Sequence, residues 1–298
     1  MEYSIFDTHC DTLCKILDCN ADFYENGCEI DLKRMSDYKS YTQVMACFVA
    51  PKFYKKAKDR TISLIKTYYR VVDNINLPNV KTILSIEGGE GIEDLKTLDE
   101  FYDMGVRMIA LTWNNTNALS GGAHEMDKNI GLSEFGKKVI HRMNELGIFA
   151  DVSHLNDKSF YDVIEYATLP IIASHSCSRA ECMHPRNITD DMFLHIVNSG
   201  GCVGINLYPM FLTKTHMATI DDVVRHIEHF MSLGGENSVG IGSDFDGVDG
   251  HLPSGISGCQ DLYKVFDRLL QLNYTDAQVE KISHKNFQTL FEKVYINS

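Results

Sequence analysis

Residues 148–176, IFADVSHLNDKSFYDVIEYATLPIIASHS, decide the fold. They begin with an apolar run of strand length, continue with a helical pattern and end with a second apolar run. A histidine follows each apolar run by two residues, His154 after the first and His175 after the second. The stretch therefore predicts a strand–helix–strand unit whose two strands end in the same kind of side chain.

The alternation of strand and helix repeats along the chain. Short apolar runs predict strands at Tyr3–Phe6, Val44–Val49, Val80–Ile86, Val106–Leu111, Ile148–Val152, Ile171–Ala173, Cys202–Leu207 and Val239–Ile241. Helical patterns lie between most of them, at Arg60–Val72, Leu95–Tyr102, Leu132–Leu146, Lys158–Tyr166, Asp191–Asn198 and Ile220–Leu233. Apolar strands separated by helices indicate a parallel sheet, and this many units in 298 residues favour a closed barrel. No GxGxxG follows the first strand, so a dinucleotide-binding sheet lacks its signature.

The tail after Ser257 predicts three more helices, Gln260–Leu272, Asp276–Ser283 and Asn286–Val294, packed on the barrel. No repeat, low-complexity tract or Pro/Gly/Ser-rich linker marks a domain boundary. We therefore expect an α/β fold in which residues 1–298 form a single (β/α)8 TIM-like barrel domain with extra C-terminal helices.

The composition of the chain indicates which binding partners and which cellular compartment to expect. The chain has a net charge of −13 and no Lys/Arg-rich block, which argues against a nucleic-acid partner. No apolar run approaches the ~18 residues needed to cross a bilayer, and the N-terminal MEYSIFDTHCD lacks the basic region of a signal peptide. The nine cysteines are scattered without a CxxC pair, as in reduced proteins. We expect a cytoplasmic protein with no membrane contact.

Polar side chains of metal-ligand type follow five of the predicted strands. They are His9 and Asp11 after the first strand, Glu87 after the third, His154 after the fifth, His175 after the sixth and Asp244 after the eighth. Each alone is a common strand-end residue, such as a cap, an ion-pair partner or a hydrogen-bonded histidine. Active sites of such barrels lie at the carboxyl ends of the strands, so their occurrence on one rim predicts a metal site.

The spacing of these residues suggests a role for each side chain. His9 and Asp11 project to the same side of an extended strand, and Glu87 precedes two glycines, where its carboxylate can bridge two cations. Imidazoles on neighbouring strands suit zinc, and Asp244 suits a general acid or base beside the metals. Of the other histidines, His141, His195, His226 and His229 are expected on solvated helix surfaces and receive no role. His124, His184 and His251 are expected in loops that border the mouth, and they stay candidates for the site.

The ordered motifs FDTHCD, SIEGGEGI, LTWNNTN, GLSEFGKKVI, DVSH, SHS, HPRN and GSDFDG resemble the membrane dipeptidase (renal dipeptidase) family of zinc peptidases over nearly the whole chain. The resemblance implies a barrel of the metal-dependent hydrolase type with two Zn²⁺ ions, other divalent metals being possible. By the same resemblance His9 and Asp11 bind one zinc, His154 and His175 bind the other, and Glu87 bridges them.

The resemblance also assigns substrate-handling residues. Asp244 matches the catalytic acid/base, Glu87 takes part in catalysis through the metals, and His154 is expected to contact the substrate. Arg186 would hold the C-terminal carboxylate of the substrate, with a structural ion pair as the alternative, and Tyr208 would line the pocket or merely pack. Mammalian relatives have a substrate-contacting histidine in an LTH motif where this chain has Trp113, its only tryptophan. The chain lacks their secretion and lipid-anchoring signals, which suggests a bacterial-type cytoplasmic relative, and family members often form homodimers.

The expected reaction is hydrolysis of a small dipeptide by a hydroxide that bridges two metals. Two alternatives stay open: another binuclear amidohydrolase that opens cyclic amides or lactones, and a non-catalytic barrel that binds metal or peptide. Hydrolases that bridge their metals with a modified lysine commonly begin with HxH, whereas this chain has His9-x-Asp11. A non-catalytic barrel is expected to have lost a ligand, and none of the predicted ones is missing.

Overall fold

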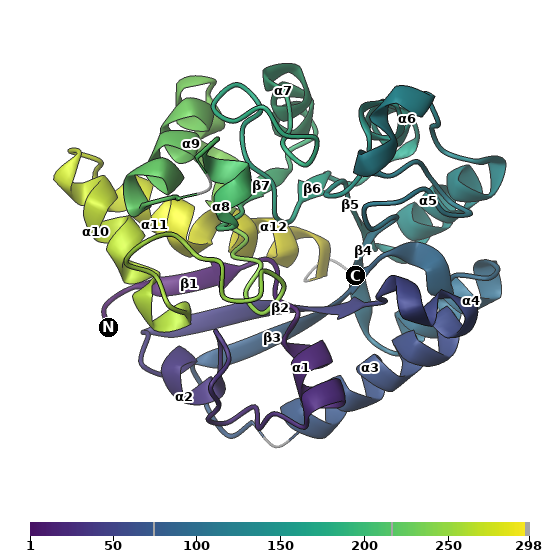
Figure 1. The fold of residues 1–298 in the computed structure, drawn as a ribbon, viewed down its shortest axis with the longest axis horizontal. Helices are drawn as coiled ribbons and strands as arrows, with labels where there is room; N and C mark the ends of the chain where they lie inside the picture. Colours follow the sequence, from purple (N-terminus) through teal and green to yellow (C-terminus); the bar gives the residue numbers. More distant parts are fainter. Residues whose placement is uncertain (74, 216, 296–298) are drawn as a thin grey trace.

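The structure is a computed structural model that describes residues 1–73, 75–215 and 217–295. Its centre is a closed barrel of parallel strands in chain order, β1 to β8 (Figure 1). The strands are β1 Ser4–Asp7, β2 Ser40–Phe48, β3 Val80–Glu87, β4 Val106–Ala110, β5 Phe149–Asp151, β6 Ile172–Ala173, β7 Cys202–Ile205 and β8 Val239–Ile241. The barrel closes where Asp7 pairs with Ile241. The predicted barrel and each predicted strand are confirmed.

Helices follow the strands and cover the outside of the barrel (Figure 1). They are α1 Thr12–Cys19, α2 Leu32–Met35, α3 Ala57–Val72, α4 Leu95–Asp103, α5 Glu134–Leu146, α6 Asp157–Tyr166, α7 Asp190–Asn198, α8 Pro209–Leu212, α9 Ile220–Ser232, α10 Tyr263–Gln271, α11 Asp276–Glu280 and α12 Asn286–Tyr295. Short 3-10 turns occur at Pro51–Lys56, Gly89–Gly91, Ala123–Lys128, Gly235–Asn237 and Cys259–Asp261, and a π-helical turn, Lys281–Lys285, joins α11 to α12. Side-chain caps begin several helices, for example Asn156 on α6, which accepts the N–H of Ser159.

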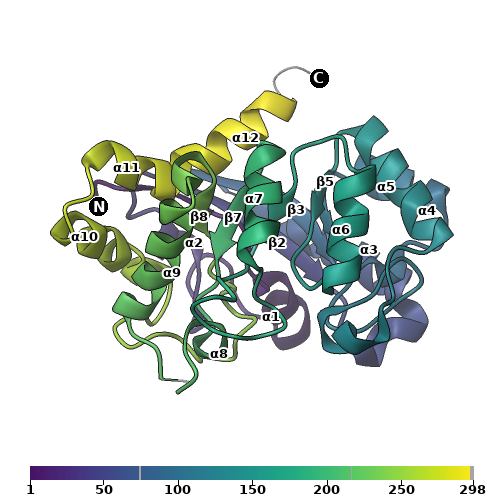
Figure 2. The ribbon, with the colours of Figure 1, turned by 90° about the horizontal axis from the view of Figure 1, so that it is seen from above.

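The last helix plugs one end of the barrel. Figure 2 shows α12 lying across that end, with α1 and α8 at the opposite end. The rings of Phe287 and Phe291 on α12 lie 5.9 Å and 5.2 Å from that of Phe6, and Phe291 lies 5.0 Å from Phe149. Phe149 is the first residue of β5, so α12 closes the amino end of the strands. The carboxyl end is left for the polar side chains.

One strand and three helices differ from the sequence prediction. Strand β2 begins at Ser40 rather than Val44, because Tyr41 pairs with Val80 and both Tyr41 and Gln43 are buried. Helices α1, α2 and α8 were not predicted. Helix α1 follows the first strand directly within a segment dominated by polar ligand-type residues, and α2 and α8 have only four residues each, too few to show a helical pattern.

The structure also bears on compartment and redox state. Within the described residues, no helix combines the length and the apolar character that a membrane span needs. The nine cysteines, all of them in the described part of the chain, are free thiols, as the sequence predicts.

Candidate metal centre

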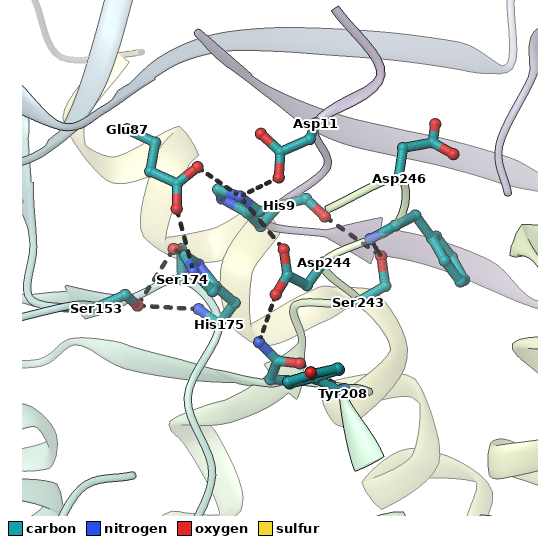
Figure 3. Close-up of polar contacts among 12 residues, drawn as sticks. His9, Asp11, Glu87, Ser153, Ser174, His175, Tyr208, Ser243, Asp244 and Asp246 are labelled. Carbon is teal, nitrogen blue, oxygen red and sulfur yellow. Dashed lines mark hydrogen bonds and ion pairs between the residues drawn. The ribbon is translucent and has the colours of Figure 1, made fainter. Parts of the chain in front are cut away.

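The five predicted ligands converge at the carboxyl end of the barrel. Figure 3 shows His9, Asp11, Glu87 and His175 pointing toward one another. On one side, His9 Nε2 lies 3.4 Å from Glu87 Oε2 and 3.6 Å from Asp11 Oδ2. On the other side, Glu87 Oε1 lies 2.7 Å from His154 Nε2 and 3.7 Å from His175 Nε2. One carboxylate oxygen of Glu87 therefore faces each pair, and the roles of the five side chains as ligands stay a prediction.

Two strand-end aspartates hold these side chains in place. Asp151, the last residue of β5, accepts the backbone N–H groups of Ser153 and Ser174, each at 2.9 Å, and the hydroxyl of Ser174. It thus ties the segment that carries His154 to the one that carries His175. Hydrogen bonds of this kind fix the orientation of ligand side chains in metal sites.

Asp7 plays the same part between the first and last strands. Its carboxylate accepts the backbone N–H of Ser243 at 2.9 Å, that of His9 at 3.3 Å and the hydroxyl of Ser243. Burial raises the pKa of Asp7 to about 6, although the hydrogen bonds from Ser243 act in the opposite direction. These hydrogen bonds bring Asp244 beside His9.

Hydrogen bonds determine which nitrogen of His175 carries the proton. The hydroxyl of Ser174 donates its one proton to Asp151, so its contact with His175 Nδ1 at 2.7 Å must accept an N–H. In His154, Nδ1 donates to Asn114 Oδ1 at 2.8 Å. Both Nε2 atoms are therefore left with lone pairs, and they lie 2.8 Å apart. Burial lowers the pKa of both rings well below the usual range, so both are neutral, as metal ligands must be.

The cluster is short of positive charge. Asp11, Glu87 and Asp244 converge on His9, and His9 Nε2 and Asp11 Oδ1 are buried without a hydrogen-bond partner among the described residues. Burial and then the Asp11 carboxylate raise the pKa of Glu87. Burial lowers the pKa of His9, yet Glu87 and Asp11 hold it well above its usual range. Unpartnered buried donors and acceptors are costly, and cations would satisfy both these atoms and the excess negative charge.

A glycine keeps space open between two of the acids. A Cβ on Gly247 would collide with carboxylate oxygens of both Asp11 and Asp244. Any side chain at this position would therefore push Asp11 or Asp244 out of the cluster. Together with the lone pairs and the unpartnered atoms, the space beside Gly247 fits divalent cations.

Asp244 stands at the edge of the cluster rather than in either predicted ligand pair. Its Oδ2 accepts the Asn206 amide at 2.9 Å, and its Oδ1 lies 3.8 Å from His9 Nε2 (Figure 3). Asp244 and His154 have φ angles of 64° and 71°, a left-handed backbone that costs a non-glycine residue about 1–3 kcal/mol. Such strain is concentrated at functional sites, where the surrounding structure holds it in place.

A cavity of about 650 Å³ opens over the cluster, and its wall includes Glu87, His154, Asp244, Arg186, Tyr208 and Trp113. Arg186 is buried, with its guanidinium 5.4 Å from the Phe211 ring and Nη2 donating to the His175 carbonyl at 3.3 Å. That is its one side-chain hydrogen bond within the described part of the chain, so most of its donors remain for a ligand. Trp113 packs at 5.4 Å against Phe48.

The expectation for His226 is wrong. The sequence analysis expects it on a solvated helix surface, but it is fully buried, and its two ring nitrogens bond the N–H of Ser178 and the carbonyl of Leu212. His229 is half-buried and bonds Asp190 at 2.7 Å. Among the loop histidines, His251 lines the cavity.

Other polar residues at the site were not singled out from the sequence. They are Asp7, Asp151, Ser174, Asn114 and Asn206, which orient the predicted side chains. One signal was available, because a serine directly precedes both His175 and Asp244. Nothing in the sequence marks Asn114 or Asn206.

Comparison with known proteins agrees with this geometry. The family described as membrane dipeptidase (Peptidase family M19) matches residues 1–297. A protein of Schizosaccharomyces pombe named as an uncharacterized dipeptidase is 33% identical over 228 residues, which are 73% of this chain. Those residues are 54% of the yeast protein, so the chain spans about half the length of that relative.

Solved structures share the fold. Dipeptidase AC, a metallopeptidase of family M19, has a TM-score of 0.91 at 25% identity, with 99% of each chain covered. A metallopeptidase of Rhodobacter sphaeroides, liganded with a phosphinate mimic of the dipeptide L-Ala-D-Ala, has a TM-score of 0.86 at 24% identity, covering 99% of this chain and 100% of that one. The family match over nearly the whole sequence shows that this chain belongs to the membrane dipeptidase family, Peptidase family M19.

Proposed function

We propose that this chain is a dipeptidase that binds two zinc ions and hydrolyses the peptide bond of small dipeptides. The observation that carries the proposal is the position of Glu87, with one carboxylate oxygen towards His9 and the other towards His154. Imidazole and carboxylate donors suit zinc. The dipeptide mimic bound by the Rhodobacter sphaeroides relative supports a dipeptide as the substrate.

Two divalent cations held by these residues would lower the pKa of a water molecule and polarise the peptide carbonyl. The protein would supply the proton transfers through Asp244. Its Oδ2 is engaged by Asn206, which leaves Oδ1 facing the cluster to take a proton from water and return it to the leaving nitrogen. Burial raises the pKa of Asp244, so it holds a proton more readily than an exposed aspartate.

Arg186 is the proposed site for the C-terminal carboxylate of the substrate. Its guanidinium lines the cavity and has donors to spare, and an arginine can bond both oxygens of a carboxylate at once. We propose that Tyr208 and Trp113 complete the wall around the substrate.

Replacing Arg186 should weaken binding of the free acid specifically. Arg186→Met is expected to raise KM for a dipeptide by about 10- to 100-fold, because a charge-assisted contact to the carboxylate is lost. The KM for the same dipeptide with an amidated C-terminus should change by less than about threefold. Steady-state kinetics on the acid and the amide measure both effects, and equal losses for the two substrates would contradict the assignment.

Metal analysis and a substrate panel test the proposed function as a whole. We expect about two zinc ions per chain by plasma mass spectrometry, and turnover of L,L- or L,D-dipeptides that stops when a chelator removes the metal. Lactones and hydantoins serve as the competing substrates. Preference for either would assign the protein to a different amidohydrolase reaction, and turnover that survives complete metal removal would refute the metal requirement.

A further inference from the structure

His226 is a buried histidine outside the metal centre, and the proposed mechanism does not use it. It lies on α9, where its Nδ1 accepts the N–H of Ser178 at 3.0 Å and its Nε2 bonds the carbonyl of Leu212 at 3.0 Å. Because Nδ1 accepts, the ring is the neutral tautomer with its proton on Nε2. Burial lowers its pKa to about 4, so this tautomer persists at neutral pH.

The two partners of His226 belong to the two segments that line the cavity. Ser178 lies in the loop between β6 and α7, residues 174–189, here called the Arg186 loop because it carries that side chain. Leu212 is the last residue of α8, which directly follows Tyr208. One imidazole therefore links the Arg186 loop to α8 and holds both against α9.

The position of Arg186 depends on how these two segments are aligned. Asn187, the next residue, donates to the Cys182 carbonyl in its own loop and to the Phe211 carbonyl in α8, both at 2.8 Å. The Phe211 ring lies against the Arg186 guanidinium. A shift between the loop and α8 would therefore move the guanidinium over the cavity.

We propose that His226 is a positioning residue for substrate binding. By keeping the Arg186 loop and α8 in register, it sets the affinity of Arg186 for the C-terminal carboxylate of the substrate without touching the substrate. This inference rests on the proposed dipeptidase function.

Two conservative variants separate hydrogen bonding from packing. The side-chain oxygen of asparagine reaches the position of Nδ1, whereas the nitrogen of glutamine reaches the position of Nε2. His226→Asn therefore keeps an acceptor for Ser178, while the Leu212 carbonyl retains its second donor, Arg225 at 3.1 Å. His226→Gln leaves the Ser178 N–H unpaired. If the hydrogen bonds of His226 matter, asparagine should raise KM less than glutamine does. If only packing matters, glutamine should raise KM less, because it is closer to histidine in volume.

We expect His226→Gln to raise KM for a dipeptide about tenfold, and His226→Asn about threefold or less, with kcat within about threefold of the wild type. The KM for the C-terminally amidated dipeptide should stay nearly unchanged in both variants. His195→Gln, a histidine replacement at a half-exposed position of α7, serves as the control. Equal losses for the acid and the amide, or a milder effect of glutamine than of asparagine, would overturn the proposal.

Hydrogen exchange supplies a readout that does not depend on turnover. Peptides covering residues 176–188 and 208–213 should exchange faster in His226→Gln than in the wild type or His226→Asn, because the backbone N–H of Ser178 loses its acceptor. Unchanged protection of both segments would overturn the role of His226. If the wild type cleaves neither the acid nor the amide, the proposed dipeptidase function fails, and so does the proposed effect of His226 on affinity for the substrate carboxylate. Hydrogen exchange still decides whether His226 holds the Arg186 loop and α8 together.

Discussion

Asp244→Asn is expected to lower kcat by about 10²- to 10⁴-fold while the protein retains its metal. Asparagine can keep the hydrogen bond from Asn206, but it then turns its amide nitrogen towards the cluster, where the wild type has Oδ1. An amide nitrogen cannot accept the proton of a water molecule. The measurement is kcat together with metal content on the same preparation. Asparagine tolerates the left-handed backbone at this position, so the fold should be kept.

Asp249→Asn is the matched control. Asp249 lies five residues further on, also has a positive φ, and has an exposed side chain. Its replacement should leave kcat unchanged. Near-normal turnover in Asp244→Asn would place the proton acceptor elsewhere. Loss of metal together with activity would instead make Asp244 a ligand, consistent with its grouping with His9 and His175.

The gathering of the ligand-type side chains at one end of the barrel could be predicted from the sequence, because the topology alone determines it. In a closed parallel barrel every strand ends on the same face, so a residue that follows an apolar run must lie near the other strand ends. His154 and His175 are far from His9 in sequence, yet the order of the strands is sufficient to bring them together. The convergence of these side chains therefore required no knowledge of side-chain contacts.

The hydrogen bonds that orient these side chains could not be predicted from the sequence. Whether Asp151 accepts from Ser174, or Asn114 from His154, depends on atomic positions that residue spacing does not determine. His226 is different, because its burial could have been predicted. It lies three residues after Val223 and four before Phe230, on the apolar face of α9, and helical periodicity places such a residue in the core.

Glu87→Gln is expected to have the other largest effect, abolishing tight binding of at least one metal and lowering kcat by about 10³-fold or more. Glutamine retains one ligating oxygen, but the amide nitrogen that replaces the other cannot bind a cation. The variant therefore loses the contact to either the His9 side or the His154 side of the cluster. Metal content after dialysis and kcat at saturating zinc measure the two effects, and Glu93→Gln, on the exposed surface nearby, is the control.

The same substitution should have the opposite effect on the metal-free fold. Burial raises the pKa of Glu87, so ionising this carboxyl opposes folding. The loss of stability grows as the pH rises above the pKa that this carboxyl has in the unfolded chain. At neutral pH, metal-free Glu87→Gln should therefore have a Tm at least equal to that of the metal-free wild type, whereas added zinc should raise the Tm of the wild type by much more. Thermal unfolding with and without zinc measures both. A variant that is less stable without metal, yet gains as much from zinc as the wild type, would mean that Glu87 supports the fold rather than the metals.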